Sequence, residues 1–396
     1  MTVDSIRGKG LGVGGKVFVV CGAGIISGKE LIALSLAKGL RDHGWAPEFI
    51  TSIWGDRDYV QRLQAAGFSV RRARLGFFSL SLNSLLLKMT LHQLAFWPSL
   101  LLSYFCRVCR ARPAATIHLN WQHALLLLPL LDPRRDIFWV HDIPRGGSLE
   151  ARALRLVGAR VARVICVSAA VAATMKAIGI PEAKISVIYN GVTIEKAAER
   201  EVAGGMLRLG IVGQIGEWKG HDDLLEAVAI LARRGLPIVL DIFGRDSSPY
   251  GESLRQRANE LGISGITRWR GFVADQAEIY GNIDVCVVPT RSAEPLATSA
   301  LEAGAFGRPV ICSARGGLPE IVEDGVTGFV VAPECPEELA RTIEAFLLDP
   351  ELQNRMGDAA QRRIREKFLH ARFSEEFSRA IEQTFWTVPR RHPREA

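Results

Sequence analysis

No stretch of this sequence is apolar for long enough to cross a membrane. The most apolar region, residues 75–108, is interrupted by Lys88, His92 and Pro98, so no run approaches the roughly 20 apolar residues that span a bilayer. The residues before Lys16 are polar and glycine-rich and lack a secretory-signal pattern. We therefore expect neither a membrane span nor a secreted protein.

Cysteine is sparse and does not form the pattern of a disulfide framework. Seven cysteines are scattered along the chain, which favours a reducing, cytoplasmic setting. Cys106 and Cys109 form a single CxxC without a second pair, which is typical of structural thiols rather than a metal site. Asp56 and Asp58 form a DxD motif, which arises by chance too often to indicate a metal. The sequence predicts no metal site.

Positive charge is concentrated in the first half of the chain. Residues 1–190 carry 24 Lys and Arg against 11 Asp and Glu, whereas the remainder carries 25 against 31. This asymmetry predicts an anionic partner for the first half, either a phosphorylated acceptor or an anionic membrane surface. No zinc-finger, RNP-type or basic-helix signature accompanies the charge, so we predict no nucleic-acid partner.

Two interpretations of residues 75–108 stay open. The region can form two amphipathic helices that are buried in the core. It can also lie in a membrane interface, with Phe96, Trp97 and Tyr104 as aromatic anchors and nearby arginines beside lipid headgroups. The basic balance of this half favours interfacial binding, and with it a position at the inner face of the membrane.

The length of 396 residues, with 48% apolar and 23% charged residues, indicates a globular chain of two domains. We expect an N-terminal Rossmann-like acceptor domain at residues 1–192 and a polar linker at 193–206. A C-terminal Rossmann-like donor domain follows at 207–370. Residues 371–396 are predicted to form a helix that packs back on the N-terminal domain and ends in a basic tail.

The N-terminal half begins with a strand–helix–strand unit that has a glycine-rich first turn. A strand at 17–21 leads into Gly22 and Gly24, followed by a helix at 29–43 and a strand at 47–52. This pattern predicts a doubly wound sheet. The glycines permit close approach of a diphosphate, or serve only tight turning. A dinucleotide dehydrogenase is disfavoured because its second strand ends in an acidic residue, and this one does not.

His141 follows a predicted strand at 136–140. Doubly wound sheets bind ligands at the carboxyl ends of their strands, so His141 is a candidate active-site residue. Other strands are expected at 116–119, 164–168 and 185–189.

The βα pattern restarts at a strand predicted for residues 207–212. The loop after it contains Gly213, Gln214 and Lys219, and we expect Asp222 to cap the next helix, at 223–234. A lysine just before a helix N-terminus is well placed to bind phosphate. Further strands are expected at 239–243, 267–271 and 285–289.

Residues 289–331 contain two successive strand–loop–helix units. The helix that opens near Thr298 favours a phosphate at its N-terminus, and the flanking carboxylates of Glu294 and Glu302 suit sugar hydroxyls. This combination predicts a nucleotide-sugar site. Ser299 and Glu302 also fit a capping box, in which Glu302 would serve only its own helix.

Several motifs occur together in a characteristic order: His141-Asp142, Ser168, Asn190-Gly191-Val192, Lys219-Gly220, Phe243-Gly244, Arg270-Gly271, Tyr280 with Asp284, Glu294-x7-Glu302, Gly307-Arg308-Pro309-Val310 and Gly316-Gly317-x-x-Glu320. In this order and spacing the chain resembles the family-four retaining glycosyltransferases. The resemblance implies the GT-B fold, in which two doubly wound Rossmann-like domains face each other across a cleft.

The resemblance also implies a function. It predicts a retaining, metal-independent, hexosyltransferase-type enzyme without a cofactor, which uses a UDP- or GDP-type sugar and a glycan or lipid-linked acceptor. Lys219 would hold the diphosphate, Glu294 the donor-sugar hydroxyls and Glu302 the ribose, and His141 would contact the reacting centre. The other donor-binding positions implied are Gly22, Gly24, Gly213, Gln214, Arg270, Leu296, Ala297 and Thr298.

One departure and two alternatives accompany this interpretation. The family usually has an arginine where this chain has Gln214, so Lys219 carries more of the charge, or Arg291 or Arg315 substitutes. A GT-B nucleotide-sugar epimerase stays open, with Asp142 and Glu30 as acid and base. So does a catalytically degenerate partner subunit.

Overall fold

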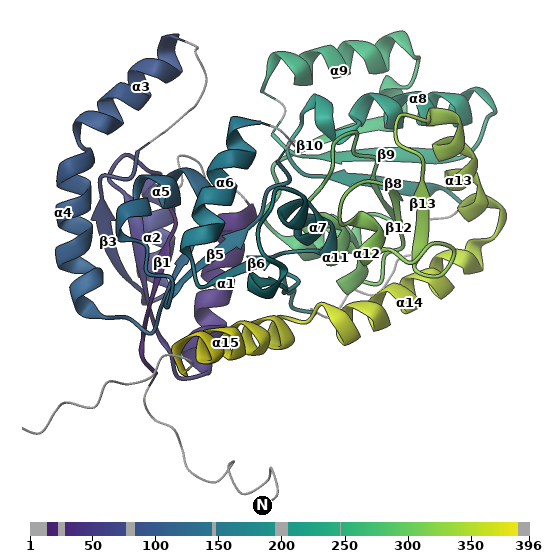
Figure 1. Ribbon diagram of the computed structural model, residues 1–396. Helices are drawn as coiled ribbons and strands as arrows, with labels where there is room; N and C mark the ends of the chain where they lie inside the picture. Colours follow the sequence, from purple (N-terminus) through teal and green to yellow (C-terminus); the bar gives the residue numbers. More distant parts are fainter. Residues whose placement is uncertain are drawn as a thin grey trace, which may run out of the picture. The chain divides into compact units, whose positions relative to one another are not determined.

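A computed structural model describes residues 14–22, 28–76, 84–144, 148–194, 205–245 and 247–386. The chain divides into two compact units. Unit 1 comprises the described residues up to Gly191 together with those from His370 onward, and unit 2 comprises Val192–Leu369. Each unit is an α/β structure with helices packed against a sheet (Figure 1).

Unit 1 is built on seven parallel strands in the order β3-β2-β1-β4-β5-β6-β7. The strands are β1 Lys16–Val20, β2 Ala46–Ser52, β3 Ser69–Ala73, β4 Ala115–His118, β5 Asp136–Val140, β6 Arg163–Cys166 and β7 Ile185–Val187. Its helices are α1 Gly28–Asp42, α2 Arg57–Ala65, α3 Ser84–Ala95, α4 Trp97–Arg107, α5 Trp121–Leu126, α6 Leu149–Arg160, α7 Ala169–Ala177 and α15 His370–Trp386.

Unit 2 repeats this plan with six parallel strands in the order β10-β9-β8-β11-β12-β13. The strands are β8 Leu207–Val212, β9 Ile238–Phe243, β10 Thr267–Gly271, β11 Val285–Val288, β12 Val310–Ser313 and β13 Gly328–Val331. Its helices are α8 His221–Arg233, α9 Pro249–Glu260, α10 Gln276–Gly281, α11 Thr298–Ala305, α12 Leu318–Ile321, α13 Pro336–Leu348 and α14 Pro350–Lys367.

In both sheets the strand order reverses beside the first strand, which pairs with the second and the fourth. This is the Rossmann order, and ligands bind where it reverses. The predicted α/β class with two doubly wound Rossmann-like halves is confirmed.

Burial explains why the central strands are almost continuously apolar. Val17 to Val20 of β1 are fully buried, as expected for a parallel strand with helices on both faces. In unit 2, α8 and α13 pack Leu225, Val228 and Ile343 into one core cluster against the sheet.

The helix α15 completes unit 1 from the far end of the chain. The Trp45 indole N–H donates a hydrogen bond to Ser378 Oγ at 2.8 Å, and Phe377 packs edge-on against Trp139 with ring centroids 5.0 Å apart. Figure 1 shows α15 in yellow beside α1 in purple. The structure describes only part of the predicted linker at 193–206. The predicted basic tail, from residue 387 onward, lies outside the described residues.

Two predicted helix details can be compared with the structure. The start of α11 at Thr298 is confirmed. The N-cap prediction for Asp222 is wrong, because α8 begins at His221 and Gly220 is its N-cap. Gly220 has a φ of 73°, a backbone conformation that glycine adopts without strain, so the helix starts before the acidic residues.

Residues 75–108 form the consecutive helices α3 and α4, while residues 77–83 lie outside the described part. Neither helix is fully buried, and in α3 the buried side chains include Thr90 and Gln93. Leu100 and Tyr104 of α4 are buried, whereas Leu91, Leu102 and Phe105 are exposed. None of the helices in the described ranges has the length and apolar character needed to cross a membrane.

Arg208 and Asp284 form a poorly exposed ion pair in unit 2. Asp284 accepts hydrogen bonds from the Arg208 backbone N–H at 2.9 Å and from its guanidinium at 2.9 Å. Because Asp284→Ala leaves a poorly hydrated arginine without its carboxylate, we expect it to lower the unfolding free energy of unit 2 by about 3 kcal/mol.

The loss of unfolding free energy is measured by unfolding in urea, with hydrogen exchange of the β8 amides as the probe. The matched control is Glu260→Ala, which removes one exposed carboxylate paired with Arg257 and should cost much less. Equal losses in the two variants would contradict a structural role for Asp284.

Candidate functional site

Lys219 and Glu294 meet at the carboxyl edge of the unit 2 sheet. Lys219 follows β8, Glu294 follows β11, and Lys219 Nζ lies 2.8 Å from Glu294 Oε2. Their side chains are 22% and 19% exposed, so both remain accessible to a ligand. Because β8 and β11 flank the point where the strand order reverses, the pair lies where such a sheet binds ligands.

Backbone contacts hold these two loops together. A Cβ at Gly220 would lie 1.9 Å from the Pro289 carbonyl oxygen, so only glycine permits this approach. The Thr290 hydroxyl and the Arg291 backbone N–H both donate to the Trp218 carbonyl, at 2.8 and 2.9 Å. The loop carrying Lys219 is therefore anchored directly to the loop that leads to Glu294.

The predicted glycine turn at Gly316-Gly317 positions Glu294 from the other side. The Gly317 N–H donates to the Glu294 carbonyl at 2.8 Å. Gly316 has a φ of 58°, and a Cβ there would lie 2.1 Å from the Glu294 oxygen. The glycine turn thus holds the Glu294 backbone directly.

Glu302 lies on α11 and is bound by a residue that the sequence did not single out for the site. The Tyr280 hydroxyl donates to Glu302 Oε2 at 2.8 Å. Burial raises the pKa of Glu302 to about 7, although this hydrogen bond opposes the shift. The capping-box interpretation is wrong, because Ala297 is the N-cap and Ser299 lies within the helix.

The N-terminus of α11 is available to an anion. Its N-cap, Ala297, makes no side-chain capping hydrogen bond, so the N–H groups of the first turn, beginning at Thr298, can serve a ligand. Leu296 and Ala297 have buried side chains, and only their backbones can contribute to binding. Thr298 is half-buried.

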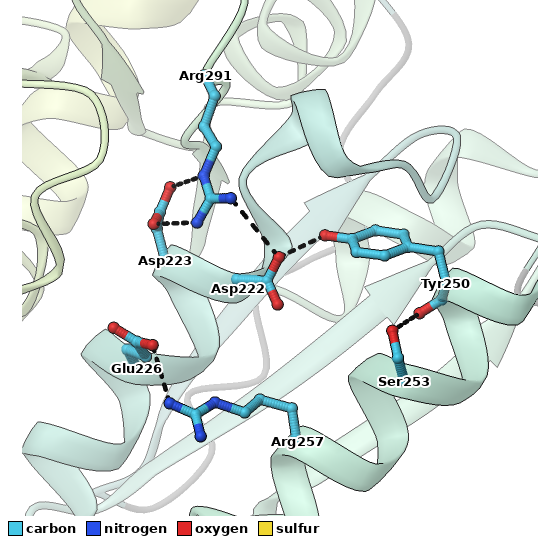
Figure 2. A network of polar contacts seen from close by, with 7 residues as sticks. All are labelled: Asp222, Asp223, Glu226, Tyr250, Ser253, Arg257 and Arg291. Carbon is cyan, nitrogen blue, oxygen red and sulfur yellow. Dashed lines mark hydrogen bonds and ion pairs between the residues drawn. The ribbon is translucent and has the colours of Figure 1, made fainter.

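Arg291 belongs to an acidic network rather than to an open phosphate site. Its guanidinium donates to both carboxylate oxygens of Asp223, at 2.8 and 2.6 Å. Asp222 lies 3.8 Å from Arg291 and accepts the Tyr250 hydroxyl at 2.6 Å (Figure 2). Hydrogen bonding to Asp223 raises the pKa of Arg291 above its usual range, so its charge is already compensated.

The other residues implicated in donor binding have distinct surroundings. Gly213 donates its N–H to the Phe243 carbonyl at 2.9 Å, and Gln214 follows it with an exposed side chain. Arg270 donates to the buried Asp241 at 2.5 Å. Arg315 lies 3.9 Å from Glu334. The structure thus joins Lys219 and Glu294 directly, whereas Arg270 is held by a different carboxylate.

In unit 1, His141 follows β5 as predicted. Its ring lies 4.3 Å from that of Trp139, and its Nε2 is buried without a hydrogen-bond partner among the described residues. Burial, together with the nearby Lys29, lowers the pKa of His141 to about 3, so the imidazole is neutral at neutral pH. Gly22 packs against His123, where a Cβ would lie 2.5 Å from the ring, and Gly24 lies outside the described residues.

Within the described part of the chain, no group of three His, Cys, Asp or Glu side chains could hold a metal ion. The DxD motif has a structural role there, since Asp56 caps α2 by accepting the Asp58 N–H at 2.8 Å. The seven cysteines are all free thiols, and Cys106 and Cys109 form no bond with each other.

Two family models match adjacent parts of the chain. The model "Glycosyltransferase Family 4" matches residues 26–196, and the model "Glycosyl transferases group 1" matches residues 194–363. The two matches correspond closely to unit 1 and unit 2.

Individual relatives agree with these models. The chain is 34% identical over 198 residues to a D-inositol 3-phosphate glycosyltransferase of Streptomyces avermitilis, a match that covers 45% of this chain and 42% of that protein. The chain thus spans less than half the length of this curated relative.

Solved structures share the architecture over nearly the whole chain. Anabaena Alr3699/HepE in complex with UDP-glucose has a TM-score of 0.76 at 21% identity, covering 94% of this chain and 100% of that one. A glycosyltransferase from Rickettsia africae has a TM-score of 0.78 at 18% identity, covering 95% and 100%. With its two family matches and its two Rossmann-like sheets, this chain belongs to the group 1, family 4 glycosyltransferases of the GT-B fold.

Proposed function

We propose that this chain transfers a sugar from a nucleotide diphosphate sugar to an acceptor hydroxyl, with retention of the anomeric configuration. The observation that carries the proposal is the Lys219–Glu294 pair at the point where the unit 2 strand order reverses. Unit 2 is assigned to the donor and unit 1 to the acceptor.

The donor fits the groups that surround this pair. Lys219 and the first-turn N–H groups of α11 supply positive potential for a diphosphate. Glu294 accepts hydroxyls of the donor sugar, and Glu302 accepts those of the ribose. A donor of the UDP type is favoured because HepE, which shares the fold, was solved with UDP-glucose.

The proposed chemistry needs no protein nucleophile. The bond from the anomeric carbon to the phosphate oxygen breaks while the acceptor oxygen bonds to the same face. The acceptor proton passes to the leaving phosphate, whose charge is stabilised by Lys219 and by the amides of α11. His141 is neutral, so its role is to contact the reacting sugar by a hydrogen bond rather than to supply positive charge.

An epimerase is less well supported. It would require acid and base groups in unit 1 that reach the sugar, and Glu30 was one candidate. Glu30 is 1% exposed, and it accepts a hydrogen bond from the Cys21 thiol at 3.9 Å. A carboxylate enclosed in this way is poorly placed to exchange protons with a substrate.

The acceptor is proposed to be anionic or lipid-linked, and the enzyme to work from the cytoplasmic face of a membrane. The basic first half of the chain fits either acceptor, and the Streptomyces relative is named for a phosphorylated polyol. The exposed leucines Leu91 and Leu102 give α3 and α4 an apolar surface. Arg107 and Arg110 lie near it in sequence and suit anionic headgroups.

Replacing either member of the central pair should abolish transfer. We expect Lys219→Ala and Glu294→Ala each to lower kcat by about 100-fold or more, because one removes the cation that stabilises the leaving diphosphate and the other a sugar contact. Nucleotide release from a panel of UDP- and GDP-sugars with glycan acceptors measures the effect. Lys176→Ala, which breaks an exposed pair in unit 1, is the control, and wild-type rates in both site variants would refute the assignment.

The binding of UDP-glucose should depend on pH through Glu302. Its pKa of about 7 in the free protein falls when ribose hydroxyls donate to the carboxylate, so binding releases a proton. We expect the affinity to rise about tenfold from pH 6 to pH 8 by this linkage. Calorimetry should show that Glu302→Gln abolishes the dependence of the affinity on pH. Glu337→Gln, which alters an exposed carboxylate of α13, should keep it. A slope unchanged in Glu302→Gln would remove Glu302 from the ribose site.

Membrane docking predicts salt-sensitive co-sedimentation with anionic vesicles. We expect Leu91→Glu combined with Leu102→Glu to lower the bound fraction about tenfold, since both changes remove apolar insertion and add repulsion. The control is Leu348→Glu, which alters a leucine that is 77% exposed in unit 2. Absence of sedimentation of the unaltered protein at low salt, where surface attraction is strongest, would contradict docking.

A further inference from the structure

A cavity of about 640 Å³ opens in unit 1 beneath α3. Its floor is formed by Gly22 after β1, Ser52 at the end of β2 and Gly76 after β3. Met89 and His92 of α3 form its wall. The cavity therefore lies at the carboxyl edge of the sheet, where a doubly wound fold binds ligands, and its size is that of a small-molecule site.

Most polar side chains that line this cavity are already satisfied by the protein. Gln93 accepts the Gly76 N–H at 2.7 Å and donates to the Arg74 carbonyl at 3.0 Å. Ser52 Oγ accepts the Trp54 N–H at 3.0 Å. His123 lies 3.4 Å from the Asn120 amide, and burial lowers its pKa to about 4.

The lining that remains for a ligand is apolar and aromatic. Trp54 and Met89 both line the cavity, and at 44% and 42% exposure their side chains remain accessible to a ligand. The Trp54 ring lies 5.5 Å from that of His92, which also lines the cavity, and these two rings form an aromatic wall. A sugar ring here would leave hydroxyls without partners, which costs free energy, whereas a hydrocarbon chain would not.

One cation lines the cavity together with this apolar surface. Lys88 is exposed, and within the described ranges no carboxylate pairs with it. The same helix carries Leu87, Leu91 and Leu94 with exposed side chains. A hydrocarbon chain bound beside α3 would therefore contact apolar surface. An anionic group at the end of that chain would lie near the positive charge of Lys88.

We propose that this cavity binds the hydrocarbon chain of an amphiphilic acceptor whose anionic group pairs with Lys88, which makes the acceptor a lipid rather than a free glycan. The role of this lipid as an acceptor rests on the proposed sugar transfer. The binding of an anionic chain rests only on the cavity, its aromatic wall and Lys88.

Quenching by bromododecyl phosphate, used below its micelle concentration, tests the site. Bromine quenches the fluorescence of a nearby indole. We therefore expect saturable quenching of tryptophan fluorescence, and we expect Trp54→Phe to remove it. Trp218→Phe, which alters another indole that is 44% exposed but in unit 2, should retain it. Because Lys88→Gln removes the positive charge that pairs with the phosphate, it should weaken binding about tenfold, with no change for uncharged bromododecanol.

Several results would overturn the site. These are quenching that is unchanged in Trp54→Phe, equal affinity for the phosphate and the alcohol in the unaltered protein, or full competition by inorganic phosphate. Lys88 and Trp54 are both exposed, so the variants should fold, and UDP-glucose binding measured on the same samples verifies this.

Donor turnover then assigns the chain to the acceptor. With UDP-glucose as donor, dodecyl glycosides should stimulate UDP release at concentrations about tenfold lower than methyl glycosides, as expected from burying apolar surface. Trp54→Phe should reduce that difference. Equal stimulation by the two would overturn a lipid acceptor and leave sugar transfer standing. Turnover with neither, alongside intact quenching, would instead count against the proposed transfer.

Discussion

The ion pair between Lys219 and Glu294 is the contact around which unit 2 is arranged. It joins the loops after β8 and β11, and it forms because Gly220 and Gly316 let backbones approach where any side chain would collide. In the free protein Glu294 neutralises the lysine, which limits the cost of holding a half-buried charge. In the proposed donor complex, the diphosphate takes over that role and leaves Glu294 to accept sugar hydroxyls. The same pair can thus serve both stability and donor binding.

Several arginines of unit 2 are paired with carboxylates, and Gln214 adds no positive charge of its own. Arg291 is held by Asp223, Arg270 by Asp241, and Arg208 by Asp284. These arginines are structural, since each compensates a poorly exposed carboxylate. In the proposed donor site, positive potential for a phosphate is therefore assigned to Lys219 and to the backbone amides at the start of α11.

Much of the fold could be predicted because its signals are local. The strands at 136–140, 207–212 and 267–271 have the predicted bounds, since buried parallel strands appear as short apolar runs between turn signals. The edge strand β3 was not predicted, because Arg71 and Arg72 interrupt its apolar pattern. Arg71 pairs there with Glu48 of β2, a contact that only the assembled sheet creates.

The sequence by itself determined the two Rossmann-like halves, the glycine turns, and the candidate roles of Lys219, Glu294 and Glu302. All of these follow from residue type, spacing and backbone preference over short stretches. Only the tertiary structure decided which partner each charge has. Glu302 is bound by Tyr280 on a separate helix, and Arg291 by Asp223, 68 residues away. Such partners depend on how distant segments pack, and local sequence patterns carry no record of that packing.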